Sequence, residues 1–278
     1  MNQQKPIRVH VITGGFPPGS PAGHDMDYAR LQLLQLLHEQ PNVLATVSND
    51  FTDIAKWLSG SQLLITYVAG PHPNEEQNQT LRQWLEAGGR WLALHGTSGG
   101  KAAPVSEQNR ARKMMKSSHH ATLGGFFLNH PPVRKFQVNV VDRGHQLTKN
   151  LPASFEVMDE LYLIELQDPA TTQVLLTTEL DKDPSPPGFG FFYDKDTALQ
   201  PDGKTRVLGY SRELGKGGVV YIALGHCHSP LNNVQPFVDT SVDTAGNTPL
   251  LFRGAWETEP FRQLLRNGIS WGVRQPQE

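Results

Sequence analysis

Three histidines follow short apolar segments that have the length and composition of buried strands. His24 follows residues 7–13 (IRVHVIT) across a Gly/Pro-rich loop, His95 ends the segment RWLAL, and His226 follows VVYIALG. Such segments are typical of buried strands. In an open α/β sheet, the loops that leave the carboxyl ends of parallel strands share one edge, and ligands bind there. Because imidazole transfers protons near neutral pH and is the commonest metal ligand, we expect an enzyme site at this edge.

Two kinds of chemistry stay open for these histidines. His95 and His226 can act as a general acid and base, with His24 and Asp25 orienting them or binding a ligand. Alternatively, His24, His95 and His226 can hold a divalent metal such as zinc and leave a position for water. No HExxH motif or other closely spaced pair anchors such a metal in the sequence. Asp25 is also well placed to cap a helix that begins at Met26.

Two further motifs suggest nucleophiles. Gly96–Gly100 (GTSGG) fits the G-x-S-x-G pattern of serine hydrolases, with Ser98 as the nucleophile. That pattern needs a helix directly after the serine, whereas GGKAAP is a poor helix start. Cys227 lies between two histidines, but neighbouring side chains of an extended segment diverge, so we interpret it as a small packed residue.

The elements around these residues alternate between strands and helices. The sequence predicts strands at residues 7–13, 43–48, 63–68 and 91–95, with helices at 26–40 and 74–87. The second helix starts behind Pro73 and stops at Gly88–Gly89, as start and stop signals require. Such an alternation indicates βαβ units and a parallel sheet.

In the second half of the sequence, the alternation of strands and helices is less regular. The sequence there predicts strands at 136–142, 156–165, 174–178, 206–211 and 219–224, and a closing helix at 259–271. Residues 181–204 and 228–257 are rich in Pro, Gly, Asp and Thr and are expected to be long loops, which are often functional. The basic cluster Arg110, Arg112, Lys113 and Lys116 is expected on a solvated helix face.

Composition bounds the class of protein. The 278 residues are enough for one large α/β domain, and we expect residues 1–278 to form a single one. A formal net charge of −2 gives no reason to expect binding to nucleic acid or an anionic membrane. The sequence shows no signal peptide and no apolar stretch of the about 20 residues that a membrane helix needs, so a cytoplasmic protein is expected. The single cysteine excludes an internal disulfide and a CxxC metal site.

Five segments resemble, in order, the motifs of the ThuA-like (trehalose utilisation) family. They are GGFPPGSPAGHD, GGRWLALHGTSGG, HHATLGGFFLNHP, GHQLTKNLPASFEVMDELY and SRELGKGGVVYIALGH, between about residues 7 and 226. The resemblance implies a flavodoxin-like sheet, the fold of class I glutamine amidotransferases, with helices on both faces. The loop before His24, residues 97–118 and residues 228–257 depart from the family pattern or add to it. A histidine at position 95, where that fold places its nucleophile, cannot replace the thiolate of a glutaminase.

The resemblance further implies sugar chemistry that passes through 3-keto intermediates. We therefore expect an enzyme that performs acid–base chemistry on a keto-glycoside or keto-sugar, with a small-molecule carbohydrate as its partner. His130, Asp159, Glu160 and Tyr162 are the expected substrate contacts. On a continuous strand, Asp159 and Glu160 face opposite sides, so only one enters the pocket, and Tyr162 shares the face of Glu160. A noncatalytic sugar-binding or regulatory domain of the same fold is the competing hypothesis, and a serine hydrolase based on Ser98 is the second alternative.

Overall fold

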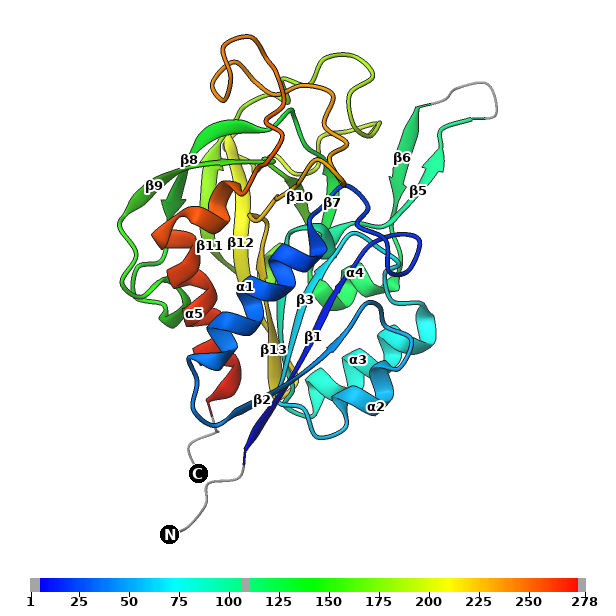
Figure 1. Ribbon diagram of the computed structural model, residues 1–278, viewed down its shortest axis with the longest axis vertical. Helices are drawn as coiled ribbons and strands as arrows, with labels where there is room; N and C mark the ends of the chain where they lie inside the picture. Colours follow the sequence, from blue (N-terminus) through cyan, green and yellow to red (C-terminus); the bar gives the residue numbers. More distant parts are fainter. Residues whose placement is uncertain (1–5, 107–110, 275–278) are drawn as a thin grey trace.

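A nine-stranded mixed sheet forms the centre of the computed structural model, which describes residues 6–106 and 111–274 (Figure 1). The strand order is β2-β1-β3-β4-β13-β12-β11-β8-β9. The first five strands pair in parallel, and the other four continue the sheet with antiparallel pairs. The parallel part has the flavodoxin-like order, so the α/β fold expected from the sequence is confirmed.

The parallel strands are short, as is usual for strands covered on both faces. Their bounds are β1 Ile7–Gly14, β2 Val43–Ser48, β3 Leu63–Val68, β4 Arg90–Leu94 and β13 Gly217–Ile222. Every residue of β3 is buried, which matches a continuous apolar segment in the middle of a parallel sheet. All four strands that the sequence predicts in the first half are present, and their carboxyl ends meet at one edge.

The antiparallel strands are β12 Thr205–Leu214, β11 Thr172–Glu179, β8 Arg134–Val140 and β9 Ser154–Asp159. Two small ribbons lie beside the main sheet. They pair β7 Gly125–Asn129 with β10 Leu163–Leu166, and β5 Lys101–Pro104 with β6 Arg112–Met115. The second ribbon projects from the body of the protein (Figure 1).

Helices cover both faces of the sheet (Figure 1). α1 Met26–His38 and α5 Glu259–Val273 pack together on one face, and α2 Ile54–Leu58, α3 Glu75–Glu86 and α4 Ser118–Leu123 lie on the other. Side chains cap the helices that the sequence predicts. Asp25 accepts a hydrogen bond from the Tyr28 amide, and Asn74 and Gln77 form a reciprocal capping box.

Two of the sequence-based expectations are wrong. Residues 156–165 are not one strand, because β9 ends at Asp159 and β10 begins at Leu163. The carboxylate of Asp159 accepts hydrogen bonds from the backbone of Glu160, Gly225 and His226, and this pulls the chain out of the ladder. The inference that Glu160 and Tyr162 share one face of a strand therefore fails.

The basic cluster is not on a helix. Arg112 and Lys113 belong to strand β6, Lys116 follows it, and Arg110 lies outside the described residues. Lys113 pairs with Asp194 in the loop of residues 181–204, and Lys116 pairs with Glu165 on β10, so these cations tie the ribbon and the residue after it to the body of the protein.

The two long loops that the sequence predicts are present above the carboxyl edge of the parallel strands (Figure 1). The loop of residues 181–204 is held by Arg206, which is fully buried on β12. Its guanidinium donates two hydrogen bonds to the Asp196 carboxylate, at 2.6 and 2.7 Å, and another to the Leu180 carbonyl. Such a bidentate pair restrains the position of the loop and also stabilises it.

Among the described residues, no helix combines the length and apolar character that a membrane crossing demands.

The buried guanidinium generates a stability prediction. We expect Asp196→Ala to lower the free energy of unfolding by about 3 kcal/mol, because it leaves a buried cation without its partner. Asp194→Ala is the matched control, since the exposed Lys113–Asp194 pair is expected to contribute at most about 1 kcal/mol. Urea unfolding followed by circular dichroism measures both. Equal losses in the two variants would contradict the assignment.

Candidate functional site

His95 is presented by a strained turn at the end of β4. Its φ of 45° is unusual for a residue that is not glycine, and a short 3₁₀ turn starts at this position. The next residue has to be small, because a Cβ on Gly96 would lie 2.5 Å from the Val68 carbonyl oxygen. The ring Nδ1 of His95 lies 2.7 Å from the carbonyl oxygen of Ala223. It therefore donates there, which leaves Nε2 directed away from the sheet.

His24 reaches the same place from the loop between β1 and α1. Its Nδ1 lies 3.0 Å from the Ala22 carbonyl and donates to it. Its Nε2 consequently faces the Nε2 of His95 at 3.1 Å. The two outward N–H groups are anchored on backbone carbonyls, and in the neutral rings the two inward nitrogens both carry lone pairs.

His226 follows β13, and a second histidine fixes its tautomer. His228 Nε2 donates to the Pro249 carbonyl at 2.9 Å, so its Nδ1 must accept. The Nε2 of His226 lies 2.9 Å from that Nδ1 and is therefore the donor. The remaining nitrogen of His226, Nδ1, has no hydrogen-bond partner among the described residues and lies 3.3 Å from Glu160 Oε1.

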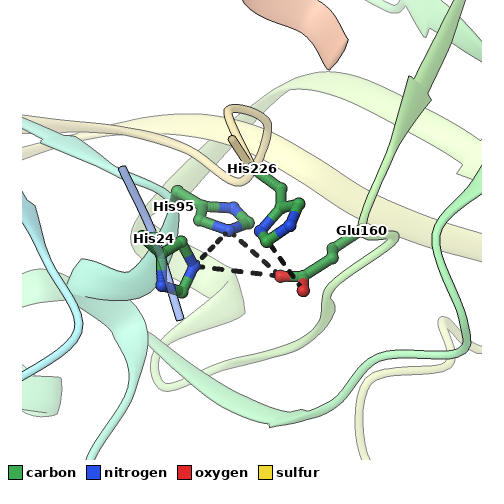
Figure 2. Close-up of side chains that lie close together, drawn as sticks. All are labelled: His24, His95, Glu160 and His226. Carbon is green, nitrogen blue, oxygen red and sulfur yellow. Dashed lines mark hydrogen bonds and ion pairs between the residues drawn. The ribbon is translucent and has the colours of Figure 1, made fainter. Parts of the chain in front are cut away.

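Glu160 reaches toward the three rings from one side, out of the break between β9 and β10 (Figure 2). Its Oε2 is 3.2 Å from His95 Nε2 and 4.0 Å from His24 Nε2. This oxygen is buried and accepts no aligned hydrogen bond from the described residues. Its other oxygen, Oε1, accepts from the side chain of Gln235.

The convergence expected from the sequence is confirmed. One ligand atom from each of His24, His95, Glu160 and His226 lies within 4.8 Å of the others, and all four side chains are buried (Figure 2). The ring centroids of His95 and His226 are 5.9 Å apart, although the residues are far apart in the chain.

Burial and the central carboxylate set the charges of these groups. Burial lowers the pKa of His24 to about 4, aided by the neighbouring His95, and it lowers the pKa of His226 well below its usual range. Burial also opposes a charge on His95, but the Glu160 carboxylate raises the pKa of His95 above its ordinary value. Although burial opposes its charge, Glu160 has its pKa held well below the usual range by His130, His226 and His95.

This donor set fits a divalent cation. Three imidazole nitrogens and one carboxylate are the ligands that zinc and other first-row metals prefer. Each ligating ring has its outer N–H held by a carbonyl or by His228, which is the arrangement found around metal-bound histidines. When the rings are neutral, their facing lone pairs and the Oε2 of Glu160, which accepts no aligned hydrogen bond, are costly on their own, and a cation among them removes that cost.

Asp159 lies beneath the cluster. It is fully buried, and its oxygens accept from the backbone amides of Glu160, Gly225 and His226 at 2.8–2.9 Å. Burial raises the pKa of Asp159 to about 7. Because its carboxylate faces the backbone, we assign Asp159 a positioning role instead of the substrate contact expected from the sequence.

His130 and Tyr162 border the cluster. His130 Nδ1 lies 2.8 Å from the Pro131 carbonyl, and its Nε2 is 3.5 Å from Glu160 Oε1. Its side chain is 13% exposed, more than those of His95, His226 and Glu160. Tyr162 stacks on His95 with centroids 4.1 Å apart. Burial, with Glu160 nearby, raises the pKa of Tyr162 well above its ordinary value, so its hydroxyl stays protonated.

Three other sequence candidates point elsewhere. Asp25 caps α1 and forms a 2.8 Å ion pair with Arg253, so it holds the loop that carries His24 and does not join the cluster. Ser98 is fully buried, and its hydroxyl bonds to the His95 carbonyl and the Tyr221 hydroxyl. Cys227 is buried beside Tyr67, and burial raises the pKa of its thiol to about 12, which fits a packed residue.

The residues that sequence reasoning missed come from residues 228–257. His228 orients His226, Gln235 bonds to Glu160, and Phe252 stacks on His228. This segment therefore covers the cluster. The alternation of His226 and His228 around Cys227 was a usable signal, because residues two apart in an extended chain lie on the same side.

The fold and the site together define a flavodoxin-like α/β protein with a buried three-histidine, one-glutamate cluster at the carboxyl edge of its parallel strands. The family model for ThuA, described as trehalose utilisation, matches residues 19–238, and the chain belongs to this family. Membership supports a role related to carbohydrate metabolism. No curated protein shows a significant match to the sequence.

Solved structures resemble this chain in fold. A ThuA-like protein from Bacteroides uniformis ATCC 8492 has 18% identity and a TM-score of 0.62, with 98% of this chain and 94% of that chain covered. A ThuA-like protein from Parabacteroides merdae ATCC 43184 has 18% identity and a TM-score of 0.57, covering 99% and 93%. A β-galactosidase from Rahnella sp. R3 has 14% identity and a TM-score of 0.51, covering 80% of this chain but 29% of that chain.

The hydrogen bond between His226 and His228 generates a prediction. His228→Leu removes the acceptor that fixes the tautomer of His226, so we expect zinc affinity to fall by about 10–100-fold. His228→Asn keeps an acceptor oxygen near the position of Nδ1 and should retain most of the affinity. Competition with a chromophoric chelator measures both variants. Equal zinc affinity of His228→Leu and the wild type would exclude this role.

Proposed function

We propose that the protein is a metal-dependent enzyme that acts on a carbohydrate. The observation that carries the proposal is the convergence of three imidazole nitrogens and one buried carboxylate oxygen within 4.8 Å of one another. Anchoring of each outer N–H means that the inward nitrogens are ready to bind a cation without rearrangement. A purely structural histidine cluster has no need of such alignment.

His24, His95, His226 and Glu160 would hold the metal, and the three imidazoles suit zinc well. A divalent cation in this site would polarise a carbonyl or hydroxyl oxygen of the sugar. This assignment replaces the acid–base pair of His95 and His226 expected from the sequence, because both rings direct their free nitrogen at the shared centre. Proton transfer to and from the substrate then falls to a neighbouring residue that does not bind the metal.

His130 is the residue that we propose for proton transfer. Its Nε2 is directed at Glu160 from the more exposed side of the cluster, where a substrate can approach. A keto group acidifies the neighbouring C–H, so a base can remove that proton and then return it to the oxygen that leaves. A positioned acid–base group of this kind contributes about 10²–10⁴-fold to the rate. Tyr162, which keeps its proton, would donate a hydrogen bond to a sugar oxygen.

Family membership supports the choice of substrate class. The proposal takes a keto-glycoside or keto-sugar as substrate, because the ThuA description concerns trehalose utilisation. A serine hydrolase mechanism finds no support, since the Ser98 hydroxyl is buried and is bonded to a carbonyl and a tyrosine instead of an imidazole.

The metal content tests the first part of this proposal. We expect the purified protein to hold about one divalent ion per chain, and Glu160→Gln to weaken the binding by more than the about 100-fold typical of an outer partner. Glu165→Gln is the matched control, because Glu165 pairs with Lys116 outside the cluster. Removal of the ion should also lower the melting temperature, since a ligand that binds the folded state stabilises it. A metal-free protein whose stability is indifferent to zinc would rule out the centre.

Turnover tests the second part. Mass spectrometry of the metal-loaded protein with trehalose, 3-keto-trehalose and related keto-glycosides should reveal a product that a chelator abolishes. His130→Ala should lower turnover by about 10²–10⁴-fold while keeping the metal. His38→Ala, on the exposed side of α1, is the control. Full activity of His130→Ala would remove this residue from the mechanism, and saturable sugar binding without any product would favour the noncatalytic alternative.

A further inference from the structure

We propose that the cavity beside His130, formed by the loop of residues 181–204, is a saccharide subsite that binds the part of the substrate extending away from the four-residue cluster. The inference rests on the proposed function for the identity of the reacting end. The inference goes beyond the proposed function, because it assigns a second binding site and a substrate of at least two rings.

The cavity has a volume of about 540 Å³, within the range of about 300–1,000 Å³ typical of small-molecule sites. The described residues that line it are Ala111, Asn129, Asp183, Ser185, Pro186, Gly188, Phe189, Gly190, Phe191, Phe192 and Tyr193. They come from the ribbon of β5 and β6, from the end of β7 and from the loop.

The cavity wall connects to the cluster through contacts with His130. Asn129 directly precedes His130 in the chain, and the Ser185 hydroxyl bonds to the His130 carbonyl at 3.4 Å. The ring of Phe189 packs edge-on against that of His130, with centroids 5.8 Å apart. A ligand in the cavity therefore lies next to the ring that faces Glu160.

The wall of the cavity is held in shape before any ligand binds. Asp183 accepts hydrogen bonds from the Ser185 hydroxyl, the Tyr193 hydroxyl and the Asn129 amide. Asn129 in turn accepts from the backbone of Phe191 at 2.9 Å. Gly190 has a φ of 71°, and a Cβ there would lie 2.1 Å from the Asn129 oxygen, so the backbone approaches closely at this point.

The lining selects a neutral, polyhydroxylated ligand. Three phenylalanines, one of them 45% exposed, offer apolar faces, while the Ser185 and Tyr193 hydroxyl oxygens, whose protons are donated to Asp183, can still accept hydrogen bonds. The described lining holds no Lys, Arg or His, and its one carboxylate, Asp183, disfavours an anionic ligand such as a phosphate ester. A sugar ring, with C–H groups on its faces and hydroxyls on its rim, has both kinds of surface that the cavity presents.

His130 lies between the cavity wall and Glu160, since its ring packs on Phe189 and its Nε2 is 3.5 Å from Glu160 Oε1. In this proposal, the reacting ring would lie near His130 and the next ring would lie on Phe189 in the cavity. We therefore infer that the substrate is a disaccharide or a larger glycoside, and that Phe189 contributes to the preference for it over a monosaccharide.

Calorimetric titration of the metal-loaded full chain with trehalose and with glucose tests this inference. We expect the wild type to bind trehalose more tightly than glucose. Phe189→Leu, which keeps the bulk but removes the aromatic face, should weaken trehalose binding by about tenfold and leave glucose binding nearly unchanged. Phe189→Trp is the matched control and should retain the preference. Metal content and melting temperature are measured for every variant, so that a loss of fold or of metal is seen directly.

The outcomes separate this inference from the proposed function. Unchanged trehalose affinity in a folded, metal-bound Phe189→Leu variant would overturn the subsite and leave the metal centre standing, as would the absence of saturable trehalose binding to the wild type. Conversely, trehalose binding that depends on Phe189 in a protein without any metal would support the subsite while the proposed chemistry fails.

Discussion

The carboxylate of Asp159 connects the two halves of the sheet at the point where the site is built. It accepts hydrogen bonds from the backbone amides of Gly225 and His226, which follow β13 in the centre, and from Glu160, which follows β9 at the edge. Carboxylates that accept several backbone amides are strongly restrained, because each donor comes from a main chain with little freedom. This one contact ends β9, brings Glu160 to the histidines and sets the direction in which His226 leaves its strand. The remaining geometry of the cluster depends on it.

The second constraint is the set of acceptors that surrounds the rings. Carbonyl groups of Ala22 and Ala223 and the ring of His228 each take one N–H from a histidine, and so determine which nitrogen keeps a lone pair. None of these acceptors touches the centre itself. The chemistry of the site is therefore specified as much by backbone groups and by residues 228–257 as by the four side chains that converge.

The parallel half of the fold was predictable because its signals are local. Apolar segments, Pro73 and the glycines after residue 87 predict the strands, the start of the helix and its end without knowledge of the rest of the chain. The convergence of His24, His95 and His226 followed from the rule that the ends of parallel strands share an edge. Glu160 was recognised as a candidate, but its place at the centre was not, because the break after Asp159 depends on a contact with residues 66 and 67 positions away. The role of Gln235 was equally hidden, since its partner Glu160 is 75 residues away in the chain.

The strand order shows that the cluster joins two parts of the sheet that are not neighbours. β9 is four places removed from β13 in the sheet, yet Glu160, directly after β9, lies 3.3 Å from His226 in the segment that follows β13. The rim of the antiparallel half therefore meets the rim of the parallel half here. Glu160 contacts the histidines, and residues 228–257 also bond to β8 through the Lys135 amide and the Ser241 hydroxyl. An ion shared between Glu160 and the histidines would bind residues from both halves of the sheet. Ion binding and the association of the two rims would therefore be thermodynamically linked. Loosening of the outer strands would then release the ion before the central strands separate.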